Sequence, residues 1–334
     1  MKILLTGGTG MCGQNILEHS KAEEHKIMSP TSDELDLLSV GSIKDYLSEH
    51  RPDLIVHTAG LVAGIQFNIK NPVRALTDNS YIALNLIKTA QDVGIENLIN
   101  LGSSCMYPRL GKNPLDESQI LTGELEPTNE GYAIAKILST RLCEYIVKED
   151  PQKRYKTLIP CNLYGRHDTF SLNFSHMIPA AIQKMHTAKL GNMNSVEIWG
   201  DGLTRREFMS ASDLADLVFY SIDNFNDMPQ NLNAGLGVDY SINEYYRAAA
   251  EVIGYDGAFQ HNLERPVGMK QKLVDVKLLR KFGWKNKRSL REGLEIAYQF
   301  YLEDLQSGVV RAKRKDAFIQ ENVLDKKIHS INHY

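Results

Sequence analysis

The sequence predicts an α/β fold in which a doubly wound parallel sheet is joined to a smaller mixed α/β domain. Over the first 160 residues, short apolar runs alternate with longer segments of helical periodicity. That alternation is typical of a parallel sheet with helices on both faces. The chain has 334 residues, which exceeds the length at which one hydrophobic core usually divides into two. We therefore expect a large and a smaller domain with a ligand cleft between them.

The strands of the large domain are predicted from apolar runs that are continuous rather than alternating. Such runs indicate strands buried on both faces. They cover residues 3–5, 54–56, 98–101 and 157–159, and a further strand is expected to end near Met28. Helical periodicity lies between them at residues 11–19, 41–49, 71–93 and 129–148.

After about residue 165 the regular alternation of apolar runs and helical segments becomes less clear. Helical patterns near 176–187, 212–223, 241–253 and 290–305 are separated by loops that contain Gly and Asn. We expect residues 1–165 to form the large domain and residues 166–308 to form mainly the smaller one, with some segments returning to the main sheet. Residues 309–334 are predicted to be a polar tail.

Composition and charge narrow the classes of function. A formal net charge of -3 gives no reason to expect a nucleic-acid or anionic-membrane partner. Four scattered cysteines without a C-x-x-C pair indicate reduced thiols in a cytoplasm and no metal site. The first apolar run ends too soon for a signal peptide. No apolar stretch approaches the ~20 residues that a bilayer span needs.

A glycine-rich turn directly follows the first predicted strand and opens a helix. Gly7, Gly10 and Gly13 make the spacing G-x-x-G-x-x-G. Without side chains there, a pyrophosphate can approach free N–H groups at the helix start, and the helix can pack close to the sheet. Glycines also serve ordinary turns, but the strand before and the helix after favour a Rossmann-type dinucleotide site. The large domain is therefore expected to bind a dinucleotide.

The tip of the second strand leaves the choice of dinucleotide open. An acid there would favour NAD, and basic residues would favour the 2′-phosphate of NADP. The tip has neither, only the hydroxyls of Ser29, Thr31 and Ser32. Asp36 and Leu37 follow at a distance suited to the adenine edge.

A candidate catalytic set lies at a strand end and on the next helix. Tyr132 and Lys136 are four residues apart, so the phenol and the ammonium share a helix face. The ammonium is expected to lower the pKa of the phenol, which makes Tyr132 a proton donor to a carbonyl. One such pair arises by chance in a chain this rich in Tyr and Lys. Ser103, at the end of the fourth strand, adds a second hydroxyl where reactive groups gather in open α/β sheets.

Together, the glycine turn, Ser103, Tyr132 and Lys136 resemble an extended short-chain dehydrogenase/reductase. Longer strings resemble the GDP-L-fucose synthase family, and the likeness runs from residue 1 to about 305. The strings are LGSSCMYP at 101–108, LEPTNEGYAIAK at 125–136, NLYGRHD at 162–168, SHMIP at 175–179 and WGDGLTRREF at 199–208. The resemblance implies that GDP-4-keto-6-deoxy-mannose is epimerised at C3 and C5 and then reduced at C4 with NADPH.

The resemblance also implies roles for further residues. Cys105 would be the base and His176 the acid of epimerisation. Trp199 would contact the guanine end and Arg206 the diphosphate, with added charge from Lys184 and Lys272. Asn162 and Leu163 would line the floor between nicotinamide and hexose. The implied cofactor-binding residues are Gly7, Thr9, Gly10, Met11, Gly13, Ser32, Asp36, Leu37, Ala59, Leu101, Lys136, Pro160, Asn162, Leu163 and His176.

The chain departs from the family pattern on the sugar side and at the 2′-phosphate. Thr169 and the stretch 170–174 are atypical, and Val267 replaces an acid that touches the sugar nucleotide. Thr9 and Ser32 stand where some members have arginines, so NADPH rests on the resemblance, and NAD stays open. The sugar-side changes suggest a modified substrate, such as a GDP-4-keto-heptose, as an alternative.

Two other classes of protein share some of these motifs. An NAD-dependent sugar-nucleotide epimerase or dehydratase has the same glycine turn and Tyr/Lys pair, but a dehydratase needs an extra carboxylate where Cys105 stands. A redox-sensing regulator would be expected to lack the intact catalytic set. The apolar character of the helices near 71–93 and 129–148 favours a homodimer.

Overall fold

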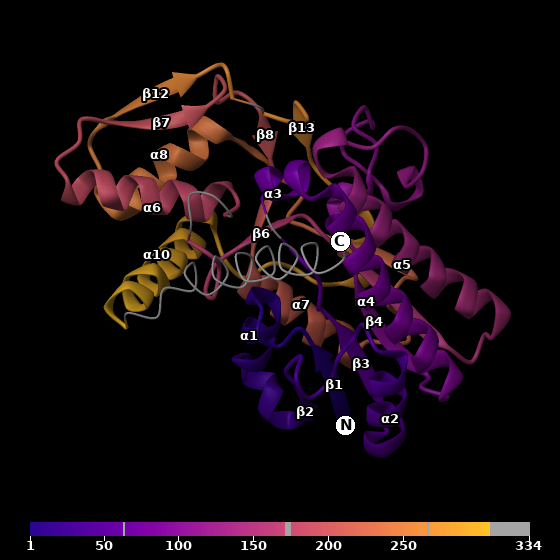
Figure 1. Ribbon diagram of the computed structural model, residues 1–334. Helices are drawn as coiled ribbons and strands as arrows, with labels where there is room; N and C mark the ends of the chain where they lie inside the picture. Colours follow the sequence, from indigo (N-terminus) through magenta and orange to yellow (C-terminus); the bar gives the residue numbers. More distant parts are fainter. Residues whose placement is uncertain (63, 171–174, 266, 308–334) are drawn as a thin grey trace, which may run out of the picture.

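The computed structural model describes residues 1–62, 64–170, 175–265 and 267–307. The predicted tail at 309–334 and most of the atypical stretch 170–174 lie outside these residues. Figure 1 shows a large α/β part that carries the N-terminus and a smaller part built from later segments of the chain. No helix in the described ranges has both the length and the apolar character that a membrane crossing needs.

The main sheet has six strands in the order β2-β1-β3-β4-β5-β10, and every neighbouring pair is parallel. Its strands are β1 (Lys2–Thr6), β2 (Lys26–Met28), β3 (Leu54–His57), β4 (Asn97–Leu101), β5 (Arg154–Pro160) and β10 (Asn231–Ala234). The reversal of strand order beside β1 makes the sheet doubly wound. The predicted fold class is confirmed. The sixth strand comes from a distant segment that joins β5.

Helices cover both faces of this sheet (Figure 1). One face is packed by α1 (Met11–Leu17) and α7 (Ala211–Asp223), which bury alternate strand residues such as Ile3 and Leu5. The other face is packed by α2 (Val40–His50), α4 (Pro72–Asp92) and α5 (Glu130–Glu149), which bury the intervening residue Leu4. The strands are therefore apolar on both faces, as their continuous hydrophobic runs predicted.

The smaller part has a hydrophobic core of its own, formed by α6 (Met177–Leu190), α8 (Ile242–Ile253) and α10 (Leu290–Gln306). Against them lies the parallel pair of β7 (Ser195–Trp199) and β12 (Ala258–Asn262). A three-stranded sheet joins β8 (Arg205–Arg206) to β11 (Tyr240–Ser241) and β13 (Gln271–Lys272). In a last parallel pair, β6 (Asn162–Tyr164), which follows β5, joins β9 (Phe208–Ser210), which precedes α7.

Local signals explain where the long helices begin. Ser241 and Ser289 each form a capping box with a glutamate three residues on, Glu244 and Glu292, which satisfies N–H groups at the starts of α8 and α10. The eight predicted helices are present within a few residues of their expected limits. Sequence periodicity missed the short elements α3 (Ile65–Lys70) and α9 (Lys277–Phe282) and the strands of the small sheets, because they span too few residues to show a period.

Candidate functional site

The candidate site lies at the carboxyl ends of the main-sheet strands. Strand β4 ends at Leu101, and Ser103 caps the short turn that follows by accepting a hydrogen bond from the Cys105 N–H at 3.2 Å. Helix α5 begins at Glu130, so its first two turns carry Tyr132 and Lys136 over the same strand end. In open α/β sheets this is the edge at which ligands bind.

Ser103 and Tyr132 lie close together at this edge, and hydrogen bonding by Ser103 acts to lower the pKa of the Tyr132 phenol. Desolvation raises the pKa of the phenol above its usual range, and the bond to Ser103 only partly opposes that rise. The sequence predicted that the ammonium of Lys136 would lower the pKa of Tyr132, and this prediction is wrong, because desolvation raises that pKa. The Lys136 Nζ atom is 5.8 Å from the centre of the Tyr132 ring, and burial dominates.

Lys136 is buried with its ammonium beneath the site. Its Nζ atom donates a hydrogen bond to the Leu101 carbonyl oxygen at 2.8 Å. Burial lowers the pKa of Lys136 to about 8, and the nearby thiols of Cys12 and Cys105 act in the opposite direction. A Cβ atom added at Gly60 would lie 3.9 Å from this Nζ atom, in ordinary van der Waals contact with the ammonium.

Cys105 is half-buried and faces hydrogen-bond donors from two directions. The Asn129 side-chain amide donates to the Cys105 Sγ atom at 3.1 Å. The buried Lys272 ammonium lies 3.9 Å from the same sulfur. Sequence reasoning placed Lys272 on the nucleotide and missed Asn129, which lies one residue before α5 and within the string that carried the family resemblance.

The glycine turn has the close packing that a dinucleotide loop requires. Gly7 has a φ of +75°, and a Cβ atom there would lie 2.6 Å from the Ala59 backbone nitrogen. At Gly13, a Cβ atom would lie 2.3 Å from the Gly7 carbonyl oxygen. The Gly10 N–H closes the turn by donating to that same oxygen at 3.0 Å. A nucleotide cofactor therefore fits this loop, because no side chain stands between its backbone and an approaching phosphate.

The remaining predicted cofactor residues are spread along the same edge. Pro160 ends β5, Asn162 and Leu163 form β6, and the half-buried His176 is the residue before α6. The Asn162 amide donates to the Glu207 carbonyl oxygen at 2.8 Å, which ties the cleft floor to the segment after β8.

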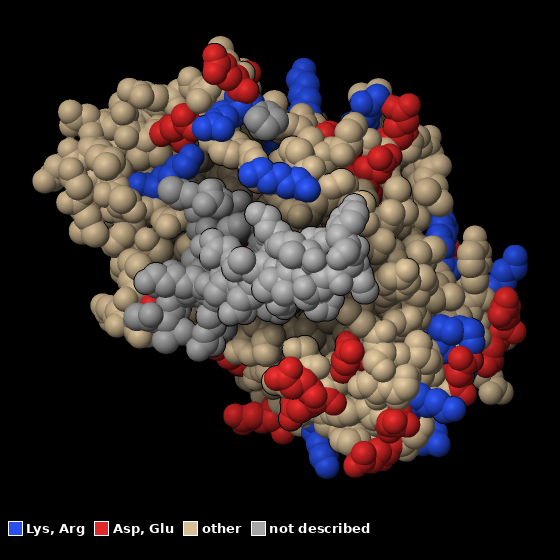
Figure 2. Space-filling model, in the orientation of Figure 1, with Lys and Arg blue, Asp and Glu red and all other residues tan. Residues whose placement is uncertain are grey.

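The predicted nucleotide residues lie on the smaller part of the protein. Trp199 ends β7, with the Lys184 ammonium 5.7 Å and the Arg265 guanidinium 5.2 Å from its ring centre. Arg206 in β8 donates to the carbonyl oxygens of Arg205 and Val267 at 2.8 and 2.9 Å. Figure 2 shows Lys and Arg side chains gathered along the upper rim of a hollow on this side of the molecule. Arg265, which the sequence did not single out, is part of this basic cluster.

The stretch that follows β2 has no basic side chain. No Lys or Arg occurs between Lys26 and Lys44, and Figure 2 shows Asp and Glu side chains in the region of β2 and α2. Thr31 is held by the Glu34 carboxylate, which accepts from its backbone N–H at 2.7 Å and its hydroxyl at 3.0 Å. The predicted residues Thr9, Ser32 and Asp36 are exposed here, and Met11 and Leu37 are half-buried.

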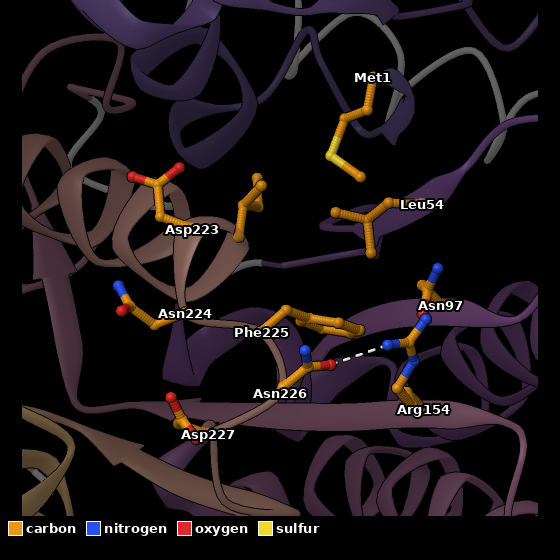
Figure 3. A pocket seen from close by; sticks show the side chains of 10 residues that line it. Met1, Leu54, Asn97, Arg154, Asp223, Asn224, Phe225, Asn226 and Asp227 are labelled. Atoms are coloured by element: carbon orange, nitrogen blue, oxygen red, sulfur yellow. Dashed lines mark hydrogen bonds between the residues drawn. The ribbon is translucent and has the colours of Figure 1, made fainter.

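A separate pocket of about 270 Å³ lies at the amino ends of β3, β4 and β5 (Figure 3). Arg154 points across it and donates to the Asn226 side chain at 2.8 Å. This is the edge of the sheet opposite to Ser103 and Tyr132, so the pocket plays no part in the candidate site. Within the described ranges, no group of three His, Cys, Asp or Glu side chains could hold a metal ion.

Comparisons with known proteins identify the family of the chain. The model of the NAD dependent epimerase/dehydratase family matches residues 3–235. The chain belongs to this family. It is 54% identical to the GDP-L-colitose synthase of Yersinia pseudotuberculosis, over 91% of this chain and 99% of that one. It is 45% identical to the GDP-L-fucose synthase of Azorhizobium caulinodans, over 90% and 96%.

Among solved structures, a GDP-D-glycero-L-gluco-heptose synthase from Campylobacter jejuni, determined in the presence of NADPH, is similar with a TM-score of 0.84 at 29% identity. The alignment covers 90% of this chain and 98% of that one. The resemblance to GDP-L-fucose synthases within the extended short-chain dehydrogenases/reductases is therefore confirmed. The family likeness spans both the glycine turn and the Tyr132 helix.

The crowding at Gly13 gives a direct test of the dinucleotide loop. Gly13→Ala would press a methyl group against the Gly7 carbonyl and is expected to weaken NADPH binding about tenfold or more, about 1.4 kcal/mol. Fluorescence titration of the purified protein with NADPH measures this. Gly41→Ala is the matched control, because its Cβ would meet only the Ser39 hydroxyl oxygen at 3.8 Å. Equal affinities in both variants would contradict the assignment.

Proposed function

We propose that the protein is an NADPH-dependent epimerase/reductase that converts GDP-4-keto-6-deoxy-mannose to GDP-L-fucose by epimerising C3 and C5 and reducing the C4 ketone. The observation that carries this proposal is the placement of Ser103 just after β4 and Tyr132 in the first turn of α5, both at the carboxyl edge of the sheet, where Ser103 acts to lower the pKa of the Tyr132 phenol. The GDP-L-fucose synthase that is 45% identical over nearly the whole chain supports it.

Two hydroxyls aimed at one ketone oxygen serve both reactions. Removing a proton next to the ketone places negative charge on that oxygen, and so does reduction at C4. Hydrogen bonds from Ser103 and Tyr132 stabilise the charge in each case. The Cys105 thiolate takes the proton from carbon, and His176 returns one from the opposite face, which inverts the centre. After reduction, Tyr132 gives its phenolic proton to the C4 oxygen.

The residues for NADPH are those of the glycine turn together with Ala59, Pro160, Asn162 and Leu163. When bound, NADPH supplies the hydride for C4. The heptose synthase determined in the presence of NADPH supports this choice of cofactor. On the substrate side, Trp199 stacks on the guanine, and Arg206 binds the diphosphate through its planar guanidinium. Lys184 contributes positive charge next to the Trp199 ring.

A second candidate is the corresponding 3-deoxy sugar. Colitose is 3-deoxyfucose, and the colitose synthase is more similar to this chain than the fucose synthase is, at 54% against 45% identity. On a GDP-4-keto-3,6-dideoxy-mannose the same site would invert only C5 before reducing C4. A GDP-4-keto-heptose is a further candidate substrate, supported by the heptose synthase whose structure is similar at 29% identity.

Substrate and catalytic roles are tested together. Purified enzyme is offered NADPH with each of the three GDP-keto-sugars, in D₂O, and the products are analysed by NMR. We expect NADPH oxidation with the 6-deoxyhexose and deuterium at C3 and C5. Turnover of the dideoxy sugar or the heptose alone would remove the fucose assignment.

Tyr132→Phe is expected to lower kcat for C4 reduction by about 10²–10⁴-fold, because the proton donor is lost. NADPH affinity should stay unchanged in this variant. Tyr145→Phe, in which an exposed phenol on the same helix is removed, is the control. Undiminished reduction by Tyr132→Phe would contradict the proposed chemistry.

The titration of Lys136 predicts a pH dependence. Its pKa is lowered to about 8, so the ammonium is present below that pH and is lost above it. We expect kcat/KM for NADPH, which reports on the free enzyme, to fall as pH rises through about 8. Lys136→Arg keeps the charge and should shift or remove this fall, although its basal rate is lower. If kcat/KM fell at the same alkaline pH in both enzymes, the fall would have to be assigned to a group other than Lys136.

We further propose a homodimer that forms through α4 and α5, within a cytoplasmic location. These two helices pack side by side and expose large apolar side chains, including Val73, Tyr81 and Leu138 at 70%, 57% and 40% exposure. Light scattering should give twice the chain mass, and Leu138→Glu should shift the protein toward a monomer. A wild-type monomer at micromolar concentration would contradict the proposal.

The division at residue 165 also remains a proposal. It is supported by the separate hydrophobic core of α6, α8 and α10, while β10 lies beyond that division in sequence and joins the main sheet.

A further inference from the structure

Glu207 is a fully buried carboxylate immediately after Arg206. It lies between β8 and β9, and its side chain has no measurable exposure. Burying a charge is costly unless the group is paired or hydrogen-bonded. Glu207 has no role in the chemistry proposed above, so its presence needs its own explanation.

The carboxylate accepts hydrogen bonds from backbone N–H groups of two different segments. Its Oε1 atom accepts from Leu236 at 2.5 Å and Gly237 at 2.7 Å, in the loop after β10. Its Oε2 atom accepts from Val274 at 2.9 Å, just after β13. An amide side chain could accept hydrogen bonds from only one of the two segments, because its oxygen accepts but its NH₂ group donates and cannot accept. A carboxylate is the group that holds both segments at once.

The segments that Glu207 holds carry two cations of the cleft. Arg206 precedes it directly, and Lys272 pairs with Arg206 in the register of β13 on β8. Lys272 in turn reaches the Cys105 sulfur at 3.9 Å. The Val274 N–H that binds Glu207 lies two residues after Lys272, so the hydrogen bond anchors the backbone close to this lysine.

We propose that Glu207 is a positioning residue that sets Arg206 and Lys272 relative to each other. Through these two cations it links binding of the nucleotide diphosphate to the pocket around Cys105. This inference rests on the proposed function. It assigns no contact between Glu207 and the substrate, and it predicts a defect in nucleotide binding that spares the dinucleotide loop.

Glu207→Gln is the test variant. Replacing one acceptor oxygen by a donor loses a charge-assisted hydrogen bond, so GDP affinity by calorimetry should weaken about tenfold, with NADPH affinity unchanged. Cys105-dependent exchange of substrate hydrogen with D₂O should slow as well. Glu292→Gln, which alters only the exposed cap of α10, is the matched control and should leave GDP affinity unchanged.

A pH profile separates this role from simple loss of structure. Burial raises the pKa of Glu207 to about 7. The titratable groups that face it are Asp239, Cys161 and Tyr245, with Lys272 beyond Cys161. A protonated carboxyl cannot hold all three N–H groups, so GDP affinity should fall as pH drops below about 7. Glu207→Gln should lack this step, while ionisation of GDP itself is common to both proteins.

Gly235→Ala provides a second approach if Glu207→Gln does not fold. Its Cβ atom would lie 2.5 Å from the Val274 Cγ2 atom and 2.6 Å from the Glu207 Oε1 atom. It should therefore disturb the contact between the carboxylate and the Val274 segment, with the same selective loss of GDP affinity. GDP binding that is unchanged in the folded variants, with the wild type binding normally, would overturn the positioning role. A wild-type protein that binds NADPH but not GDP would instead overturn the proposed function.

Discussion

The buried ammonium of Lys136 is the constraint around which the carboxyl edge of the sheet is arranged. A charge removed from water must be compensated, and here its hydrogen bond is to the Leu101 carbonyl at 2.8 Å. This one hydrogen bond does not fully offset desolvation, so the pKa of Lys136 is lowered to about 8. The neighbours that bear on the pKa of the ammonium are the thiols of Cys12 and Cys105. Gly60 also lies beside it, and a Cβ atom there would crowd the Asn79 side chain at 3.0 Å.

That constraint links the two halves of the proposed chemistry. The helix that brings Lys136 over β4 also carries Tyr132, and Asn129 just before the helix reaches Cys105. Since the strand end that accepts from Lys136 also leads into Ser103, all of these groups are fixed by one strand–helix pair. The cations of the smaller part then approach the same sulfur from the other side through Lys272. Epimerisation and reduction can therefore share one oxygen-binding position.

The long elements could be predicted from the sequence, because periodicity over ten or more residues encodes a helix face and a continuous apolar run encodes a buried strand. The positions of Ser103 just after a strand and of Tyr132 near the start of the next helix could be predicted in the same way, while their catalytic roles stay a prediction. The approach of Lys272 to Cys105 could not be predicted, since it depends on the register of the two-residue strands β8 and β13. The pKa of Tyr132 was misjudged because residue spacing reveals a neighbouring charge but not desolvation.

The charges of the cleft also bear on how the protein distinguishes its two nucleotides. In the proposed function, the basic cluster around Trp199 and Arg206 would attract the diphosphate of the substrate. At the β2 tip, by contrast, Thr31 is engaged with Glu34, and the stretch from Lys26 to Lys44 has no other cation. Within this stretch, the donors that a 2′-phosphate would meet are hydroxyl and backbone N–H groups rather than cations. Such contacts discriminate by geometry more than by charge, so preference for NADPH over NADH should depend little on ionic strength.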